Sequence, residues 1–117
     1  MKPMKDRMHT GELYLPHDPD ILREQNQCLE RLYDFNHTRP SQLKERQALL
    51  KTMLAEVGEG CYIEPPFYAN WGGHHVHFGS HIYVNFGLTC VDDTHIYIGD
   101  YTMIAPRVTL ASAGHPI

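Results

Sequence analysis

The last eight residues, LASAGHPI, contain a histidine that could take part in acid–base chemistry. His115 lies between Gly114, which allows the backbone to bend, and Pro116, which fixes the direction of the chain. An imidazole with an ordinary pKa of about 6.5 can accept a proton from a hydroxyl group near neutral pH. Composition alone favours an exposed loop histidine, so the interpretation of His115 depends on the elements that position it.

A second group of histidines lies in the segment GGHHVHFGSH. The group consists of His74, His75, His77 and His81. Histidines this close in sequence suggest a zinc site. However, His77 lies between the apolar residues Val76 and Phe78 and is expected to point outward, whereas His81 falls at a turn. The rings do not converge within one element, so we expect no metal.

Composition narrows the class of protein. The 117 residues carry 10 basic and 14 acidic side chains, a net charge of -4, without a basic run that could follow a phosphate backbone. No stretch approaches the roughly 20 apolar residues that cross a bilayer, and the first residues lack a signal-peptide core. Three cysteines without a CxxC pair favour free thiols. We therefore expect a cytoplasmic protein that binds neither nucleic acid nor membrane.

Residues 1–56 form a helical segment by their pattern. The run DPDILREQNQCLERLYDFNH predicts a helix over about 19–35, with Asp18 as its cap and apolar residues near helical spacing. Its apolar positions are Leu22, Leu29, Leu32, Tyr33 and Phe35. After HTRPS, Ser41 is expected to cap a second helix, QLKERQALLKTML. Its predicted buried face is Leu43, Leu50, Met53 and Leu54, and its predicted solvated residues are Lys44, Glu45, Arg46 and Lys51.

Residues 57–117 repeat one template three times. The copies VGEGCYIEPPFYA, FGSHIYVNFGLTC and IGDYTMIAPRVTL each open with an apolar residue and a glycine and then alternate. The segments VHF and IYI add one more short strand before the second and third copies. Stacked coils would place equivalent residues in apolar ladders. The expected ladders are Ile63, Val84 and Ile104, and Phe67, Leu88 and Val108, with Cys61 and Cys90 buried in neighbouring columns.

The hexapeptide rhythm of IGDYTM followed by IAPRVT resembles the left-handed parallel β-helix acyltransferases. More narrowly, GELY, YDFNHTRPS, VGEGCYIEPPFYANWG, VNFGLTCVDD and IGDYTMIAPRVTLASAGHPI resemble the galactoside and maltose O-acetyltransferases over residues 4–117. The resemblance implies a mainly β solenoid, a left-handed parallel β-helix preceded by the helical segment. It also implies a homotrimer that transfers an acetyl group from acetyl-CoA to a galactoside, maltose or glucose-like sugar.

The resemblance also implies roles for individual residues. The histidine of GHP, His115, corresponds to the catalytic base. Asn85 replaces Glu64 and Ala105 of the other copies and should point to the coil surface, where its amide could bind a sugar hydroxyl. Asp93 lies in VDDTH, where an ordinary turn aspartate is equally consistent with the pattern alone. The expected acceptor-binding residues are Asn85, Asp93, Tyr83 and Trp71 as aromatic faces, and Asp18, which also caps a helix.

The coils that supply most of the coenzyme A groove in the family have no counterpart in these 117 residues. We therefore expect a chain that is truncated after about three coils. Two alternatives to the acetyltransferase remain at this point. One is a truncated, non-catalytic trimerisation or sugar-binding module. The other is a zinc-dependent carbonic anhydrase-like hydratase, which is implied by the resemblance because related left-handed helices include metal-dependent proteins of that kind.

Overall fold

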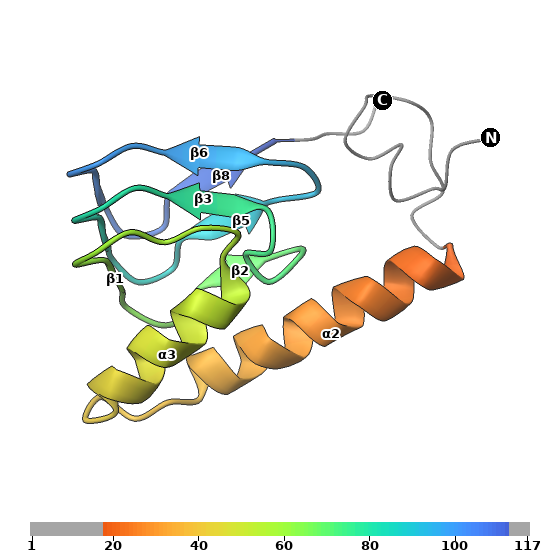
Figure 1. Cartoon of the computed structure of the whole chain (residues 1–117), viewed down its shortest axis with the longest axis horizontal. Helices are drawn as coiled ribbons and strands as arrows, with labels where there is room; N and C mark the ends of the chain where they lie inside the picture. Colours follow the sequence, from red (N-terminus) through yellow and green to blue (C-terminus); the bar gives the residue numbers. More distant parts are fainter. Residues whose placement is uncertain (1–17, 113–117) are drawn as a thin grey trace.

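The computed structural model describes residues 18–112, which form two helices followed by eight short strands (Figure 1). The helices are α2 (Pro19–Asn36) and α3 (Leu43–Met53). The strands are β1 (Tyr62–Ile63), β2 (Tyr68–Ala69), β3 (Val76–Phe78), β4 (Tyr83–Val84), β5 (Thr89–Val91), β6 (Ile96–Ile98), β7 (Met103–Ile104) and β8 (Thr109–Ala111). Both helices pack against the end of the strand stack that begins with β1 and β2.

The strands form three parallel sheets, each built from equivalent strands of successive coils. Their orders are β1-β4-β7, β2-β5-β8 and β3-β6. Ile63 pairs with Val84, and Val84 pairs with Ile104, so the first predicted ladder is confirmed. The predicted VHF and IYI strands are β3 and β6 and pair in register. The stacked coils predicted for residues 57–117 are thus confirmed as far as residue 112.

Apolar columns inside the coils explain why such short strands form. Val84 and Leu88 are fully buried, and Tyr68 N donates to Leu88 O at 2.9 Å, which keeps Phe67 and Leu88 in one column. The predicted burial of Cys61 and Cys90 is also confirmed. Burial, with Asp92 as a second cause, raises the pKa of Cys90 to about 12, so this thiol is inert at neutral pH.

Helix α2 begins where the sequence predicts. The Asp18 side chain caps it by accepting hydrogen bonds from Asp20 N and Ile21 N at 3.0 and 3.3 Å. The buried face consists of Ile21, Cys28, Leu32 and Phe35. Leu22 and Tyr33 lie off this face and are exposed, although their apolar character had placed them on it. Neither described helix is long and apolar enough to cross a lipid bilayer.

Helix α3 differs from the prediction at its start. It begins at Leu43 after Gln42, and Ser41 does not act as its cap. The Gln42 side chain instead accepts a hydrogen bond from Arg39 N at 2.7 Å, which closes the turn between the helices. Leu43 is exposed rather than buried, because the helix begins beyond the edge of the coil core. Leu50 and Met53 are buried as predicted.

The prediction that Arg46 is solvated is wrong, because the side chain is 4% exposed. Its Nε donates to Thr38 Oγ1 at 2.8 Å, and its Nη1 donates to the hydroxyl of Tyr62 at 2.9 Å. The Tyr62 hydroxyl in turn donates to the Glu64 carboxylate. A long arginine can bury its stem while its charged head finds polar partners. Arg46 therefore joins the connection between the helices to the first strand.

Helices and coils share one hydrophobic core. Leu32, Phe35 and Leu50 of the helices belong to the same buried cluster as Ile63 and Phe67 of the first coil. The predicted segments 1–56 and 57–117 are therefore packed into one unit over their described parts. Their boundary stays a prediction about segments of sequence.

We expect Arg46→Ala to lower the free energy of unfolding by about 2–3 kcal/mol, because the part-buried hydroxyls of Thr38 and Tyr62 lose a charged donor. Urea denaturation at one fixed protein concentration measures the change. Lys44→Ala, on the exposed side of the same helix, is the matched control and should change stability by less than about 0.5 kcal/mol. Equal losses in the two variants would contradict the bridging role of Arg46.

Candidate functional site

The candidate site residues lie at two corners of the coil. Asn85 follows β4, in the turn that leads to β5, whereas Asp93 follows β5, in the turn that leads to β6. The three residues of β5 span about 10 Å at 3.3 Å per residue. Because this strand separates the two corners, the chain does not bring Asn85 and Asp93 together by itself.

The first corner carries Tyr83 and Asn85. Alternation along β4 directs both side chains outward while Val84 between them is buried. The Tyr83 ring stacks on Tyr62 of the coil before, with centroids 5.8 Å apart. Asn85 Oδ1 accepts from Phe86 N at 2.8 Å. Tyr83 and Asn85 therefore share one outward face, as the sequence predicts for Asn85.

The second corner carries the adjacent aspartates Asp92 and Asp93. Asp93 is half-buried, and its Oδ1 accepts a hydrogen bond from Asn70 Nδ2 at 3.2 Å. Asp92 is fully buried, and its carboxylate accepts from Trp71 N at 2.7 Å and Gly73 N at 3.0 Å. This carboxylate fixes the loop of residues 70–75, in the preceding coil, against the corner.

Desolvation raises the pKa of Asp92 above its ordinary value, while the backbone hydrogen bonds, Trp71 N first among them, oppose the shift. The sequence pattern did not lead us to expect a role for Asp92. The available signal was the alternation of β5, in which Cys90 points inward and Val91 outward, so that Asp92 follows on the inward side. Asp92 and Asp93 therefore have different environments because successive side chains along an extended chain point to opposite sides.

Trp71 does not present the flat face that was expected to meet a sugar. Its side chain is 3% exposed and packs in a small cluster with Ile21 and Cys28. The bond from its backbone N–H to Asp92 turns the loop so that the ring lies under α2. Asp18 serves as the helix cap. His115 lies outside the described residues.

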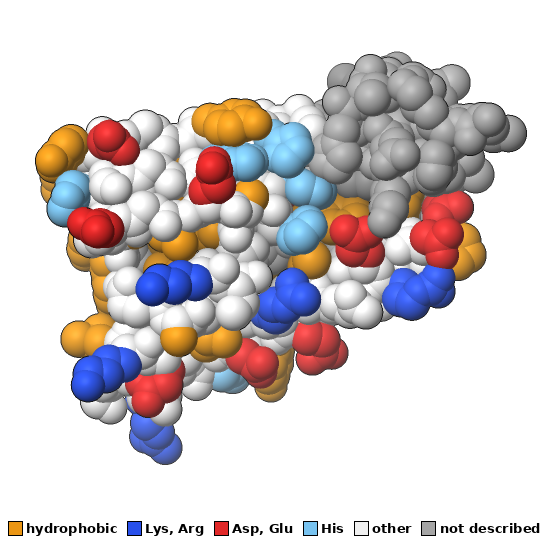
Figure 2. All heavy atoms as spheres, in the orientation of Figure 1, with side chains coloured by type: hydrophobic (Ala, Val, Ile, Leu, Met, Phe, Trp, Pro, Cys, Tyr) orange, Lys and Arg blue, Asp and Glu red, His pale blue; other side chains and the backbone are white. Residues whose placement is uncertain are grey.

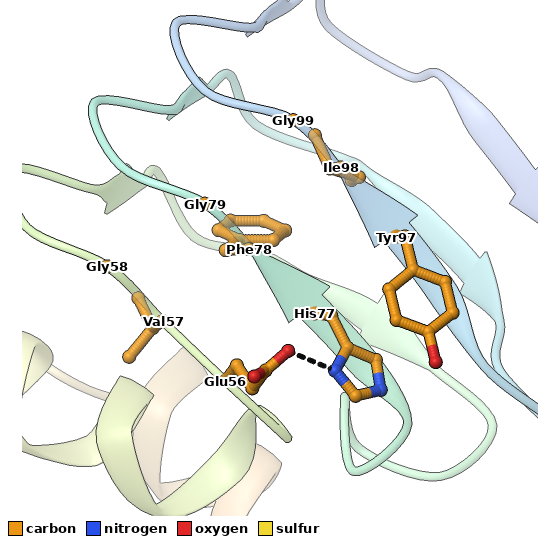
Figure 3. A pocket seen from close by; sticks show the side chains of 9 residues that line it. All are labelled: Glu56, Val57, Gly58, His77, Phe78, Gly79, Tyr97, Ile98 and Gly99. Atoms are coloured by element: carbon orange, nitrogen blue, oxygen red, sulfur yellow. Dashed lines mark hydrogen bonds and ion pairs between the residues drawn. The ribbon is translucent and has the colours of Figure 1, made fainter.

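One group of histidines, in pale blue, lies in the upper middle of the view, whereas other histidines lie apart from it at the left edge and the lower side (Figure 2). His77 points outward from β3, as predicted, and lies in a groove of the β3 and β6 face beside Glu56 and Tyr97 (Figure 3). His77 Nδ1 lies 2.6 Å from Glu56 Oε2, and Nε2 lies 2.8 Å from Nδ1 of His95. His95 was not among the histidines expected to lie together, because it is distant from His77 in sequence.

His81 sits apart from this group. It lies at the predicted turn with a φ of 59°, and its ring stacks on Tyr101 of the next coil. Within residues 18–112, no set of three or more histidine, cysteine or carboxylate side chains has the arrangement of a metal site. The described histidines make hydrogen bonds and ring contacts with neighbouring side chains and backbone carbonyls.

Comparison with known proteins gives consistent matches. Residues 7–58 match the family described as the maltose acetyltransferase hexapeptide capping motif. The chain is 50% identical over 111 residues to a galactoside O-acetyltransferase of Lactococcus lactis, covering 95% of this chain and 54% of that protein. It is 40% identical over 115 residues to the galactoside O-acetyltransferase of Escherichia coli, covering 98% of this chain and 56% of that protein.

Solved structures of similar proteins give matches of the same kind. A galactoside acetyltransferase in complex with coenzyme A superposes with a TM-score of 0.92 at 39% identity, covering 100% of this chain and 58% of the other. A maltose O-acetyltransferase from Clostridium difficile superposes with a TM-score of 0.95 at 28% identity, covering 99% and 62%. The chain spans a little over half the length of the relatives that it matches.

Asp92→Asn keeps the size of the side chain but places an amide donor against one of two backbone donors. We expect it to lower the free energy of unfolding by about 1–3 kcal/mol at neutral pH. Because the pKa of Asp92 is raised in the folded protein, the folded state binds a proton before the unfolded state does as pH falls. As the pH falls from the raised pKa of the folded protein to the ordinary value of 3.8, the free energy of unfolding of the wild type therefore increases relative to that of the variant.

Urea denaturation of both proteins between neutral and acid pH tests this expectation. Asp34→Asn, on the exposed side of α2, is the matched control. A deficit of the Asp92 variant that shrinks on acidification would contradict the assignment of a buried, raised-pKa carboxyl.

Proposed function

The chain belongs to the galactoside and maltose O-acetyltransferase family, and on this basis we propose that it transfers an acetyl group from acetyl-CoA to a hydroxyl of a sugar. The observation that carries the proposal is the 50% identity to a galactoside O-acetyltransferase over nearly the whole chain. The coenzyme A complex of a structural relative supports acetyl-CoA as the donor. The acceptor is a galactoside, maltose or a glucose-like sugar.

A sugar hydroxyl is a poor nucleophile at neutral pH, so its attack on a thioester benefits from a base. His115 removes the hydroxyl proton as the sugar oxygen bonds to the acetyl carbon, and it returns a proton to the departing coenzyme A thiolate. The Asp93 carboxylate accepts hydrogen bonds from the sugar hydroxyls, and the Asn85 amide can both donate to and accept from them. Tyr83 contributes an apolar ring face.

The second corner supports placing His115 and Asp93 at one site. Ser112, three residues before His115, lies against this corner. Its N–H donates to Val91 O at 3.0 Å, and its hydroxyl donates to Thr94 O at 2.8 Å. The described chain therefore arrives beside Asp93 just before the histidine.

The distance between the corners supports an assembly. Asn85 and Tyr83 lie at the opposite end of β5 from Asp93, so no single corner of one copy carries all three residues. We propose a homotrimer in which Asn85 and Tyr83 of one copy face Asp93 and His115 of its neighbour. Left-handed winding of the coils and a cytoplasmic location are further parts of the proposal, carried by the family and by the free buried cysteines.

We expect His115→Ala to lower kcat for sugar acetylation by roughly 10²- to 10⁴-fold, because the hydroxyl loses its general base. Release of coenzyme A thiol, with and without sugar, measures the rate. His81→Asn, a turn histidine whose replacement tolerates a positive φ, is the matched control and should retain the wild-type rate. Unchanged turnover of the His115 variant would remove the assigned base.

A mixing experiment tests whether the site is shared. Asn85→Ala and Asp93→Ala should each lower kcat/KM for the sugar by about tenfold or more, as expected for loss of a hydrogen bond to a bound hydroxyl. Co-expressed together, they form mixed trimers in which one site per trimer combines an intact Asn85 with an intact Asp93. Activity of the mixture should then exceed that of either variant.

In the control, two differently tagged copies of the same variant are co-expressed. The activity of these assemblies should not exceed that of the single variant. Mixed assemblies no more active than the average of the two variants would show that both residues act from one copy.

A further inference from the structure

We propose that Asn70 is a positioning residue for the carboxylate of Asp93, and that helix α2 holds Asn70 in place through Gln25. The inference rests on the proposed function, because it assigns Asn70 a part in binding the sugar acceptor. It comes from a chain of polar contacts that runs from the helical segment to the second corner of the coil.

Asn70 directly follows β2 and lies one coil before Asp93. Its side-chain Nδ2 donates to Asp93 Oδ1 at 3.2 Å. Its backbone is held on both sides, since its N–H donates to Cys90 O at 3.2 Å and its carbonyl accepts from Gln25 Nε2 at 2.7 Å. Strand register and helix α2 together thus set the place of the amide.

The loop that follows is equally constrained. The buried Asp92 carboxylate holds the backbone N–H groups of Trp71 and Gly73. Gly72 has a φ of +62°, and a Cβ there would lie 2.4 Å from the carbonyl oxygen of Cys28, so the loop backbone packs closely on α2. Asn70 therefore starts a loop whose backbone is fixed from both the helix and the next coil.

This placement gives Asn70 a defined effect on sugar binding. A donor at Oδ1 favours one rotation of the Asp93 carboxylate about its terminal bond, and so sets the direction in which the carboxylate meets a sugar hydroxyl. A group oriented in advance loses less freedom when the acceptor binds. Asn70 should therefore affect acceptor affinity and leave the chemical step and the donor largely unaffected.

The first test is Asn70→Asp, which keeps the size of the side chain and its backbone contacts but replaces the donor with a second carboxylate facing Asp93. We expect the acceptor KM to rise about tenfold or more, while kcat and the KM for acetyl-CoA stay within about twofold. Asn26→Asp makes the same chemical change on exposed α2 and should leave all three constants unchanged. Thermal unfolding of each variant checks that the fold is kept.

The second test is a double-mutant cycle with Asn70→Ala and Asp93→Ala. If Asn70 acts through Asp93, Asn70→Ala should raise the acceptor KM about three- to tenfold in the wild type and change it by less than about twofold in the Asp93→Ala background. Equal effects in both backgrounds would overturn the positioning role. Rescue by Asn70→Gln, which retains the amide donor, would further separate positioning from a general loss of structure.

The outcomes separate this inference from the proposed function. Sugar-dependent transfer by the wild type, combined with an unchanged acceptor KM in Asn70→Asp, would overturn the inference alone. Absence of sugar-dependent transfer and of sugar binding by the wild-type chain, measured by calorimetry, would overturn both.

Discussion

The register between successive coils is the constraint on which the rest of the structure depends. Each strand of two or three residues makes too few hydrogen bonds to fix its own alignment, so the buried columns supply the missing specificity. Tyr62 N donates to Ile82 O and Tyr83 N to Thr102 O, in a register that keeps Ile63, Val84 and Ile104 stacked. A shift by one residue would turn the Val84 column outward and the Tyr83 column inward. The direction in which each corner side chain points therefore depends on this register.

Two buried polar side chains tie the remaining parts to the coils. Arg46 links the helical connection to β1 through Thr38 and Tyr62, and Asp92 links the loop after β2 to the turn after β5. Both are satisfied by several hydrogen bonds, which is the condition for a charged group to remain inside a protein. Because Arg46 reaches Tyr62, and Tyr62 stacks on Tyr83, the helices also support the first corner of the site. The helical segment thus contributes to both corners.

Periodicity in the sequence was sufficient to predict the parallel coils, the buried cysteines and helix α2 with its Asp18 cap, because each depends on local pattern. The errors have a common origin in tertiary contacts. The charge of Arg46 suggested solvent, but Tyr62 and Thr38 offer partners that lie elsewhere in the sequence. The size of Trp71 suggested a sugar platform, but the hold of Asp92 on its backbone buries the ring. The separation of Asn85 from Asp93 could have been inferred from the position of β5 between them, whereas the pairing of Asn70 with Asp93 depends on the register of neighbouring coils.

The hold of Asp92 on the loop after β2 has a consequence for how proteins of this architecture could diverge. The aspartate contacts backbone N–H groups, which are present whatever side chains the loop carries. A substitution at Asn70 could therefore alter the surface beside Asp93 while the loop backbone keeps its hydrogen bonds to Asp92. Gly72 and Gly73 cannot be replaced as freely, because their φ values of 62° and 92° disfavour residues with a side chain. A fixed frame with exchangeable side chains is a route by which one scaffold can come to accept different ligands through few mutations.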